Sequence, residues 1–541
     1  MWLKGRGRRT CIRGQGLGNL FLICWHVVGS VMYGALIYLP TCLNLTHRRI
    51  SMYSPYDLCG RKHVFADWEI VEPGYGVYWG GERDGGWEMP YGIRISTHKP
   101  RIDSHPLFLP EYPWEKEIHG STSVFEDGGR LRLYYPASHG GTNPEGEYEP
   151  QVTMMAYAES SDGSNWTRPT IGQVEFQGST QNNITFPASG TIFKDESAAP
   201  QERYKLIYQD KTGGGDRVLG AFSSDGLAWT KFDSPILSNY VSDTQIVANY
   251  DSEKGKYVGY FRGWDRHEHG RVHGRRAIAY SETDDFTRWP KPERIVRPDG
   301  QDGPATDIYT NAYTQWPDGG DAHLMFPTFY QRARDTTELH IMTSRDGILW
   351  ERHSREPIVS QPDPGTSGMP GLDWHAGVYA GTGLVNAHPD EYSLIISPSY
   401  RSHNNLMDIP ESHLRDEYHR LGYLCKATWR KDGFTSIEAE DRGGFTTYPI
   451  LFNGGRLELN AWTRFRGEIR VEVADATVET RPNPAPSIPG RTLADCDPIT
   501  GDSLSRVVTW NGESDLSAWS GRQVRLRVQM TRARLHTLRF I

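Results

Sequence analysis

The chain has 541 residues and a formal net charge of −8, from 67 acidic and 59 basic residues. The length excludes a single small module, and the acidic balance argues against nucleic acid as a partner. Aromatic residues reach 12% of the chain, alongside 57 Gly and 34 Pro. That composition is typical of many short strands joined by turns, so we expect an all-β protein.

The N-terminal segment is apolar from about Leu17 to Leu45 and is preceded by a cluster of Lys and Arg residues. A basic stretch before an apolar run is typical of a signal peptide or an uncleaved anchor. We therefore expect residues 1–51 to export the protein or to tether it to a membrane, which would be its only membrane association. The alternative is that residues 1–51 are a mis-assigned extension and that Met52 is the true start, which would make the protein cytoplasmic.

A repeat organises residues 64–442. The pattern Ser-x-Asp-Gly-x-x-Trp ends at Trp166, Trp229 and Trp350, a degenerate copy ends at Trp289, and a weaker one lies at 431–434. Two strand-like runs precede each copy, and the first run ends on a turn aspartate: Asp127, Asp195, Asp251, Asp318 and Asp390. Units of roughly 60 residues with this order predict a five-bladed β-propeller. The repeated aspartates and the Asp-Gly turns are expected to be structural, since they occur in every unit.

The repeat stops near Gly443. Beyond it, Gly467–Val473 and Val524–Val528 alternate apolar and polar residues, which predicts half-buried strands. We expect a C-terminal β-sandwich over residues 443–541. It is either a carbohydrate-binding module or a structural partner of the propeller, and we favour the latter.

Several segments resemble an uncharacterised bacterial group of glycosyl hydrolases in the family 32 and family 43 propeller superfamily. They are 306–312, 445–449, 493–498, 501–503 and 534–540. The resemblance covers residues 64–541 and implies a five-bladed propeller, a trailing sandwich and an activity on carbohydrate. The catalytic motifs of family 32 are not present in this sequence, so its catalytic triad and its fructan specificity are not carried over.

Candidate site residues follow from propeller geometry, because ligands bind at one mouth of the central channel, near the starting ends of the innermost strands. Glycoside hydrolysis needs paired carboxyl groups. The non-repeating carboxylates expected there are Asp243, Asp307, Glu115 and Glu117. The expected substrate-binding residues are His119, Asn183, Arg262, Tyr309, Asn311, Trp374 and His375. Either aspartate could instead anchor a neighbouring blade through hydrogen bonds.

The sequence thus predicts a glycoside hydrolase that acts on an oligosaccharide or polysaccharide without a cofactor. No CxxC, P-loop or HExxH motif occurs, and the spacing of His267, His269 and His273 matches no strong metal-ligand pattern, so no metal site is expected. Two alternatives stay open. One is a non-catalytic carbohydrate-binding propeller, and the other is a different carbohydrate chemistry, such as phosphorolysis or elimination.

Overall fold

The computed structural model describes residues 54–74, 89–103, 105–142, 148–209, 216–268, 271–360, 376–399, 402–404, 422–478 and 485–541, with the backbone of two strands nearer the N-terminus. It divides into two units, Met1–Ser54 and Pro55–Ile541.

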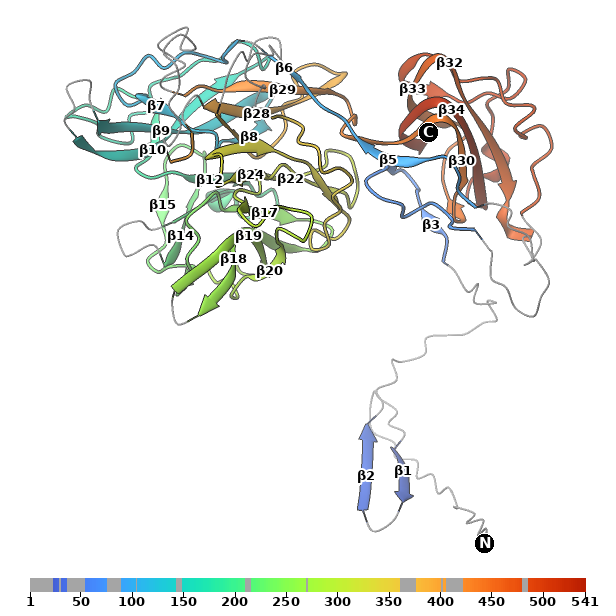
Figure 1. Ribbon diagram of the computed structural model, residues 1–541, viewed down its shortest axis with the longest axis horizontal. Coiled ribbons are helices and arrows are strands. Elements are labelled where there is room, and N and C mark those ends of the chain that lie inside the picture. The colour runs from blue at the N-terminus through green and yellow to red at the C-terminus, as the bar shows by residue number, and fades with distance from the viewer. Residues whose placement is uncertain are drawn as a thin grey trace. The chain divides into compact units, whose positions relative to one another are not determined.

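The described part of the first unit is an antiparallel hairpin of β1 (Ile23–Val28) and β2 (Val31–Leu36), in which Ile23 pairs with Leu36 (Figure 1). Among the described residues, no helix is long and apolar enough to cross a membrane. Export or anchoring by residues 1–51 therefore stays a prediction.

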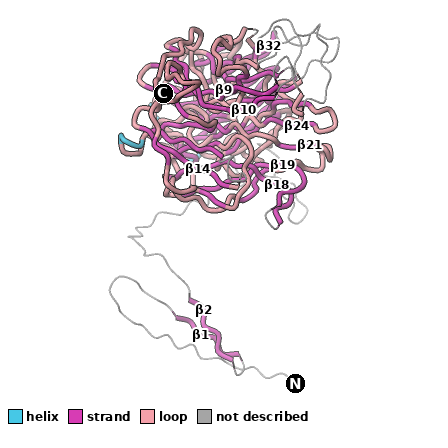
Figure 2. Tube along the Cα trace, turned by 90° about the vertical axis from the view of Figure 1, so that its left-hand side faces the viewer, coloured by secondary structure: helices cyan, strands magenta, loops and turns pink. Residues whose placement is uncertain are grey.

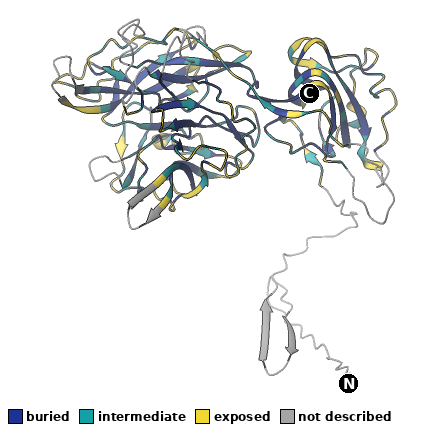
Figure 3. Cartoon of the chain, in the orientation of Figure 1, coloured by how far each residue is buried: buried dark blue, intermediate teal, exposed yellow. Residues whose placement is uncertain are grey.

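The second unit is built almost entirely from strands and turns (Figure 2). Its described helical segments are the short 3-10 turns η1 (Pro200–Glu202), η3 (Ala476–Val478) and η4 (Ser517–Trp519). Buried residues concentrate in the strands (Figure 3). The expected all-β class is confirmed.

The first three repeats each form one antiparallel sheet. In the first, β7 (Glu117–Ile118) and β8 (Ser123–Asp127) both pair with β9 (Arg130–Thr142), followed by β10 (Tyr148–Ser160) and β11 (Ile184–Phe186). The second contains β12 (Gly190–Lys194), β13 (Tyr204–Gln209), β14 (Arg217–Ser223), β15 (Thr230–Lys231) and β16 (Leu237–Ser238). The third contains β17 (Val247–Asp251), β18 (Lys256–Glu268), β19 (Arg271–Thr283) and β20 (Glu293–Val296).

The fourth repeat is divided into two three-stranded sheets. One contains β21 (Thr306–Ile308), β24 (Thr328–Gln331) and β25 (Thr336–Leu339), and the other contains β22 (Tyr313–Gln315), β23 (His323–Met325) and β26 (Met342–Ser344). Two backbone features accompany the break: Pro327 cannot donate to a strand ladder, and Ala312 has a φ of 43°.

The fifth repeat contains β27 (Gly377–Ala380), β28 (Glu391–Ser399) and β29 (Cys425–Arg430), and its outer strand is β6 (Arg101–Ile102) from far earlier in the chain (Figure 1). A parallel bridge between Ser123 and Thr382 joins the first repeat to the fifth. These contacts close the repeats into a ring, so we call the ring the propeller and its repeats blades 1 to 5.

The Asp-Gly turns have the structural role expected for them. Asp225 Oδ1 accepts hydrogen bonds from the backbone N–H groups of Leu227 and Ala228, at 2.8 and 2.9 Å. Its carbonyl oxygen accepts a bond from Arg132 of blade 1, so the turn also ties neighbouring blades together. A turn aspartate also joins neighbouring blades: the hydroxyl of Tyr204, in blade 2, donates to Oδ2 of Asp127, in blade 1, at 2.5 Å.

A pair of glycine substitutions tests this packing. Gly226 and Gly172 have nearly the same positive φ, 78° and 76°, but a Cβ at Gly226 would lie 2.4 Å from the Tyr134 hydroxyl oxygen, whereas nothing lies within 4 Å of one at Gly172. We expect Gly172→Ala to cost about 1 kcal/mol from backbone strain alone, and Gly226→Ala about 1–3 kcal/mol more from the clash. Urea unfolding of both variants measures the difference. Equal costs would contradict tight packing between blades 1 and 2.

The C-terminal part is one bent sheet of eight described strands: β3 (Tyr56–Asp57), β4 (Lys62–Val64), β5 (Arg94–Thr97), β30 (Thr435–Thr446), β31 (Ile450–Leu451), β32 (Leu457–Asp475), β33 (Asp502–Val507) and β34 (Gln523–Phe540). Register shifts between Ala439 and Arg442, and between Thr463 and Glu468, interrupt its long strands. The parts of these strands before and after each register shift contribute to a single hydrophobic core, as the two layers of a β-sandwich do.

The boundaries expected at residues 64 and 443 do not match the strand pairing. Strand β30 begins at Thr435 and already belongs to the C-terminal sheet, and β4 and β5 pair with β34 and β30. The chain therefore builds part of this sheet before it enters the propeller. Short N-terminal strands carry no repeat signal, so the sequence could not show which sheet they complete.

Two neighbouring histidines of the C-terminal part, His98 and His536, carry no charge at pH 7. The His98 and His536 ring centroids are 5.3 Å apart, and His98 Nε2 lies 2.8 Å from Ser436 Oγ. Burial, with a contribution from Arg534, lowers the pKa of His98 from 6.5 to about 4. Burial also holds the pKa of His536 well below its usual range.

Acid should therefore destabilise the fold through these rings. The unfolded chain takes up a proton on His98 below about pH 6.5 and the folded chain does so only near pH 4, so stability falls across that window as pH decreases. We expect His98 to contribute a loss of ~1–2 kcal/mol at pH 5, allowing for its partial exposure. Unfolding of wild type and His98→Gln at pH 7 and pH 5 measures this. An equal loss in both proteins would place the acid sensitivity elsewhere.

Candidate active site

A cavity of about 500 Å³ lies at one mouth of the propeller. All five blades line it, mainly through the segments that lead into their innermost strands: 117–121, 189–191, 243–246, 309–310 and Tyr379. Its size is in the range of small-molecule sites. Four expected residues line this cavity: Glu117, His119, Asp243 and Tyr309.

Asp243 presents a carboxylate to the cavity from the segment before β17. Its side chain is 43% exposed, and Oδ1 lies 3.3 Å from Nη1 of Arg262. The Arg262 side chain has no exposed surface, and burial lowers its pKa, a shift that Asp243 opposes. An accessible anion is thus held against a buried cation at the cavity wall.

Arg262 does not line the cavity itself, and Tyr309 holds its buried side chain in position. Its Nη2 donates to the Tyr309 carbonyl oxygen at 3.1 Å, and its guanidinium lies 4.5 Å from the centroid of the Tyr309 ring. Among the described residues, no acceptor forms a hydrogen bond with its Nε or Nη1, and the Asp243 carboxylate at 3.3 Å contacts Nη1 as an ion pair only. Asp243 is therefore the counter-ion that compensates the burial of this charge.

Glu117 is the second carboxylate of the cavity and comes from β7. Its Oε2 accepts a hydrogen bond from Gln151 Nε2 at 3.2 Å and lies 3.7 Å from His119 Nε2. His119 Nε2 is also 2.9 Å from Ser138 Oγ. Unlike Asp243, Glu117 has no Lys or Arg partner among the described residues, so the two carboxylates face the same cavity from different electrostatic environments.

Aromatic rings form another part of the wall. The Tyr309 and His403 ring centroids are 4.5 Å apart, and the Tyr379 hydroxyl oxygen is 2.9 Å from His403 Nδ1. Burial and the nearby Arg276 lower the pKa of His403, so this ring is neutral at neutral pH. These rings offer flat apolar faces with polar edges, which suit a ligand that has both apolar C–H faces and hydroxyl groups.

Asp307 does not line the cavity. It is fully buried and binds two arginines: Arg276 donates from its backbone N–H and Nη1, each at 2.8 Å, and Arg332 donates from Nη2 and Nε at 2.8 and 2.9 Å. Arg276 belongs to β19 of blade 3, whereas Asp307 belongs to β21 of blade 4. These contacts support the alternative given above, in which this aspartate anchors a neighbouring blade.

Glu115 is also buried away from the cavity. Its carboxylate accepts bonds from Arg168 Nη1 at 2.7 Å and from the Tyr135 hydroxyl at 2.5 Å. Asn183 donates to the same Tyr135 hydroxyl at 2.8 Å and accepts a bond from Trp114 Nε1 at 2.8 Å. Both side chains therefore hold blade 1 together.

Asn311 is buried as well, and it donates to the carbonyl oxygens of Gln245 and Tyr260. Trp374, His375 and His269 lie outside the described residues, as do the side chains of His267 and His273. Within the part of the chain that the structure describes, no group of three or more His, Cys, Asp or Glu side chains is placed to hold a metal ion.

Sequence reasoning missed several polar groups of the cavity, among them Gln151, Tyr379 and His403. Gln151 comes from the third strand of blade 1, and His403 follows β28, so neither lies before an innermost strand. Tyr379 does lie in the innermost strand of blade 5, and its position could have been found by aligning the repeats.

No protein-family model matches the chain, and no curated protein matches it. Solved structures with similar folds do exist. The family 43 arabinoxylan arabinofuranohydrolase from Bacillus subtilis, solved with cellotetraose, is 12% identical with a TM-score of 0.37, over 82% of this chain and 99% of that one. The α-L-arabinofuranosidase from Podospora anserina, solved with cellotriose, is 12% identical with a TM-score of 0.40, over 62% and 97%.

A third similar structure is an N-acetylgalactosamine deacetylase from F. plautii, solved with blood group B trisaccharide. It is 15% identical with a TM-score of 0.40, over 62% of this chain and 96% of that one. Other similar structures are also described as glycoside hydrolases or glycosidases. All of these structures are 12–15% identical to this chain, with TM-scores of 0.37–0.40.

Proposed function

We propose that the protein is a glycoside hydrolase whose active site is the cavity at the propeller mouth. The observation that carries this proposal is that Glu117 of blade 1 and Asp243 of blade 3 line the same cavity, Asp243 beside the buried Arg262 and Glu117 beside Gln151 and His119. Paired carboxyl groups that differ in their surroundings are what glycosidic bond cleavage requires.

The two carboxylates would divide the reaction between them. Arg262 compensates a negative charge on Asp243, so Asp243 suits the role of nucleophile or of base toward a water molecule. Glu117 would then donate its proton to the leaving oxygen as the bond from that oxygen to the anomeric carbon breaks. The rings of Tyr309 and Tyr379 would hold the sugar.

A release assay tests the proposal directly. The full chain is incubated with neutral and acidic oligosaccharides and polysaccharides, and reducing sugar is measured for wild type and Glu117→Gln. We expect release by wild type and a loss of about 10²–10⁴-fold in the variant, the usual contribution of a general acid. Release that depends on added phosphate, or an unsaturated product, would assign a different carbohydrate chemistry to the same cavity.

A second function is supported by the position of Asp307. Its burial leaves the cavity with two carboxylates among the described lining residues, without a third to adjust them. A propeller that binds carbohydrate without cleaving it is therefore the second candidate. Saturable binding of a glycan, together with no release from any member of the panel, would favour it.

A further inference from the structure

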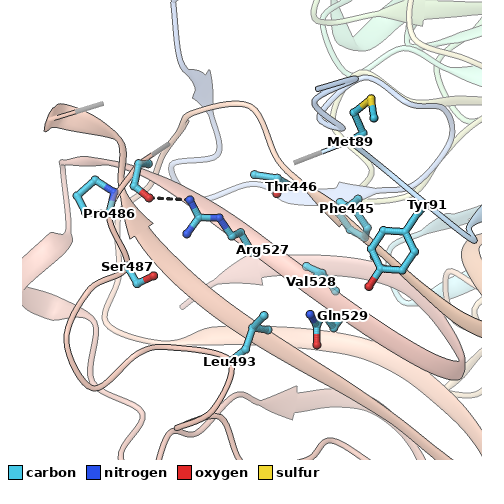
Figure 4. A pocket seen from close by; sticks show the side chains of 12 residues that line it. Met89, Tyr91, Phe445, Thr446, Pro486, Ser487, Leu493, Arg527, Val528 and Gln529 are labelled. Atoms are coloured by element: carbon cyan, nitrogen blue, oxygen red, sulfur yellow. Dashed lines mark hydrogen bonds between the residues drawn. The ribbon is translucent and has the colours of Figure 1, made fainter. Parts of the chain in front are cut away.

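A second cavity, of about 450 Å³, lies on the C-terminal sheet, away from the propeller mouth. Its floor is the face of β30 and β34 that carries Thr446, Arg527 and Gln529. Tyr91 and Met89 lie on one side of it, and Pro486, Ser487 and Leu493 lie on the other, with the floor residues between them (Figure 4). We call this cavity the sheet groove.

Arg527, the one charged residue among the described residues that line the sheet groove, is paired with Glu472 of β32. Arg527 Nη1 donates to Glu472 Oε1, and its Nη2 donates to the Ala485 carbonyl oxygen at 2.6 Å. Ser487 donates its hydroxyl proton to Glu472 at 2.7 Å. The floor therefore carries polar groups without a net charge, which disfavours an anionic or cationic ligand.

Tyr91 provides an aromatic face at the rim. Tyr91 is 54% exposed, and its ring lies over Gly444, where a Cβ would be 3.1 Å from Tyr91 Cε1. The backbones of Tyr91 and Gly444 exchange hydrogen bonds of 3.0 and 2.9 Å. This pairing occupies the edge of β30 at the groove, so an extended peptide cannot add there as a further strand.

We propose that the sheet groove binds a neutral saccharide chain. Exposed apolar surface on Tyr91 and Met89 would contact the C–H faces of sugar rings, while the exposed amide of Gln529 would bond to hydroxyl groups. The volume admits one or two sugar rings. The proposal rests on the proposed function and deepens it by adding a site that holds the same class of substrate outside the mouth. It favours the carbohydrate-binding alternative for the C-terminal sandwich over the purely structural one.

Binding can be measured separately from cleavage. The full chain with Glu117→Gln is run in gels that contain arabinoxylan, mannan, inulin or polygalacturonate, and dissociation constants follow from the retardation. We expect at least one neutral polysaccharide to retard the protein and the anionic polygalacturonate not to. Adding Tyr91→Ala and Gln529→Ala should weaken binding at least about tenfold.

Phe465→Ala is the matched control, because this aromatic side chain is 84% exposed on the same sheet and does not line the groove. Gln529→Ala alone, at an exposed position, keeps the test valid if the double change unfolds the protein. Binding as tight in the groove variants as in the parent would place the glycan at the mouth and overturn the proposal, as would a failure to bind any neutral polysaccharide. Neither outcome depends on whether wild type releases sugar.

Discussion

Replacing Asp243 with Asn should lower sugar release by about 10³-fold or more, since the change removes the anionic carboxylate from the cavity. Asn keeps the shape of the side chain but cannot act as nucleophile or base. The measurement is kcat/KM on the best substrate of the release assay. Because Asn also leaves the buried Arg262 without its counter-ion, we expect a loss of ~1–3 kcal/mol in unfolding free energy, less than for a fully buried pair because Asp243 is 43% exposed.

A paired variant separates these two effects. Replacing Arg262 with Met together with Asp243→Asn removes the buried charge as well as its partner, so the double variant should regain most of the lost stability. It should not regain activity, because the carboxylate is still missing. Sugar release that returns with stability would show that Asp243 acts only through the fold, and would move the catalytic group elsewhere in the cavity.

Replacing Asp307 with Asn should lower the unfolding free energy by about 3–5 kcal/mol, a cost typical of breaking a buried ion pair. Asp307 is fully buried, and two arginines from different segments share its carboxylate. Asn cannot compensate either charge, and Arg276 is largely buried. Chemical denaturation of the purified variant gives the value.

The control for this change is Asp441→Asn. Asp441 also faces an arginine, Arg532 at 3.7 Å, but its side chain is 79% exposed, so solvent screens the pair and no measurable loss is expected. If Asp307→Asn were as stable as wild type and inactive, the first expectation, a catalytic Asp307, would be restored and the anchoring role rejected.

The sequence by itself determined the features that depend on short segments. Turns such as Asp225-Gly226 are specified by a few adjacent residues, because the Asp side chain bonds its own backbone and Gly adopts a positive φ. Their recurrence showed the propeller. The position of Asp243 and Glu117 before innermost strands also placed both at the mouth, since all blades start their inner strands around the same channel.

Only the tertiary structure decided which polar residues stabilise the fold and which line the cavity. Asp243 and Asp307 occupy comparable places in the sequence, but Arg276 and Arg332 converge on Asp307 from other segments, whereas Arg262 leaves Asp243 exposed. The strand β6, which completes blade 5, is likewise separated from its partner by most of the propeller. These contacts form between segments that lie far apart in the sequence, and a local pattern of residues does not show which distant segments will meet.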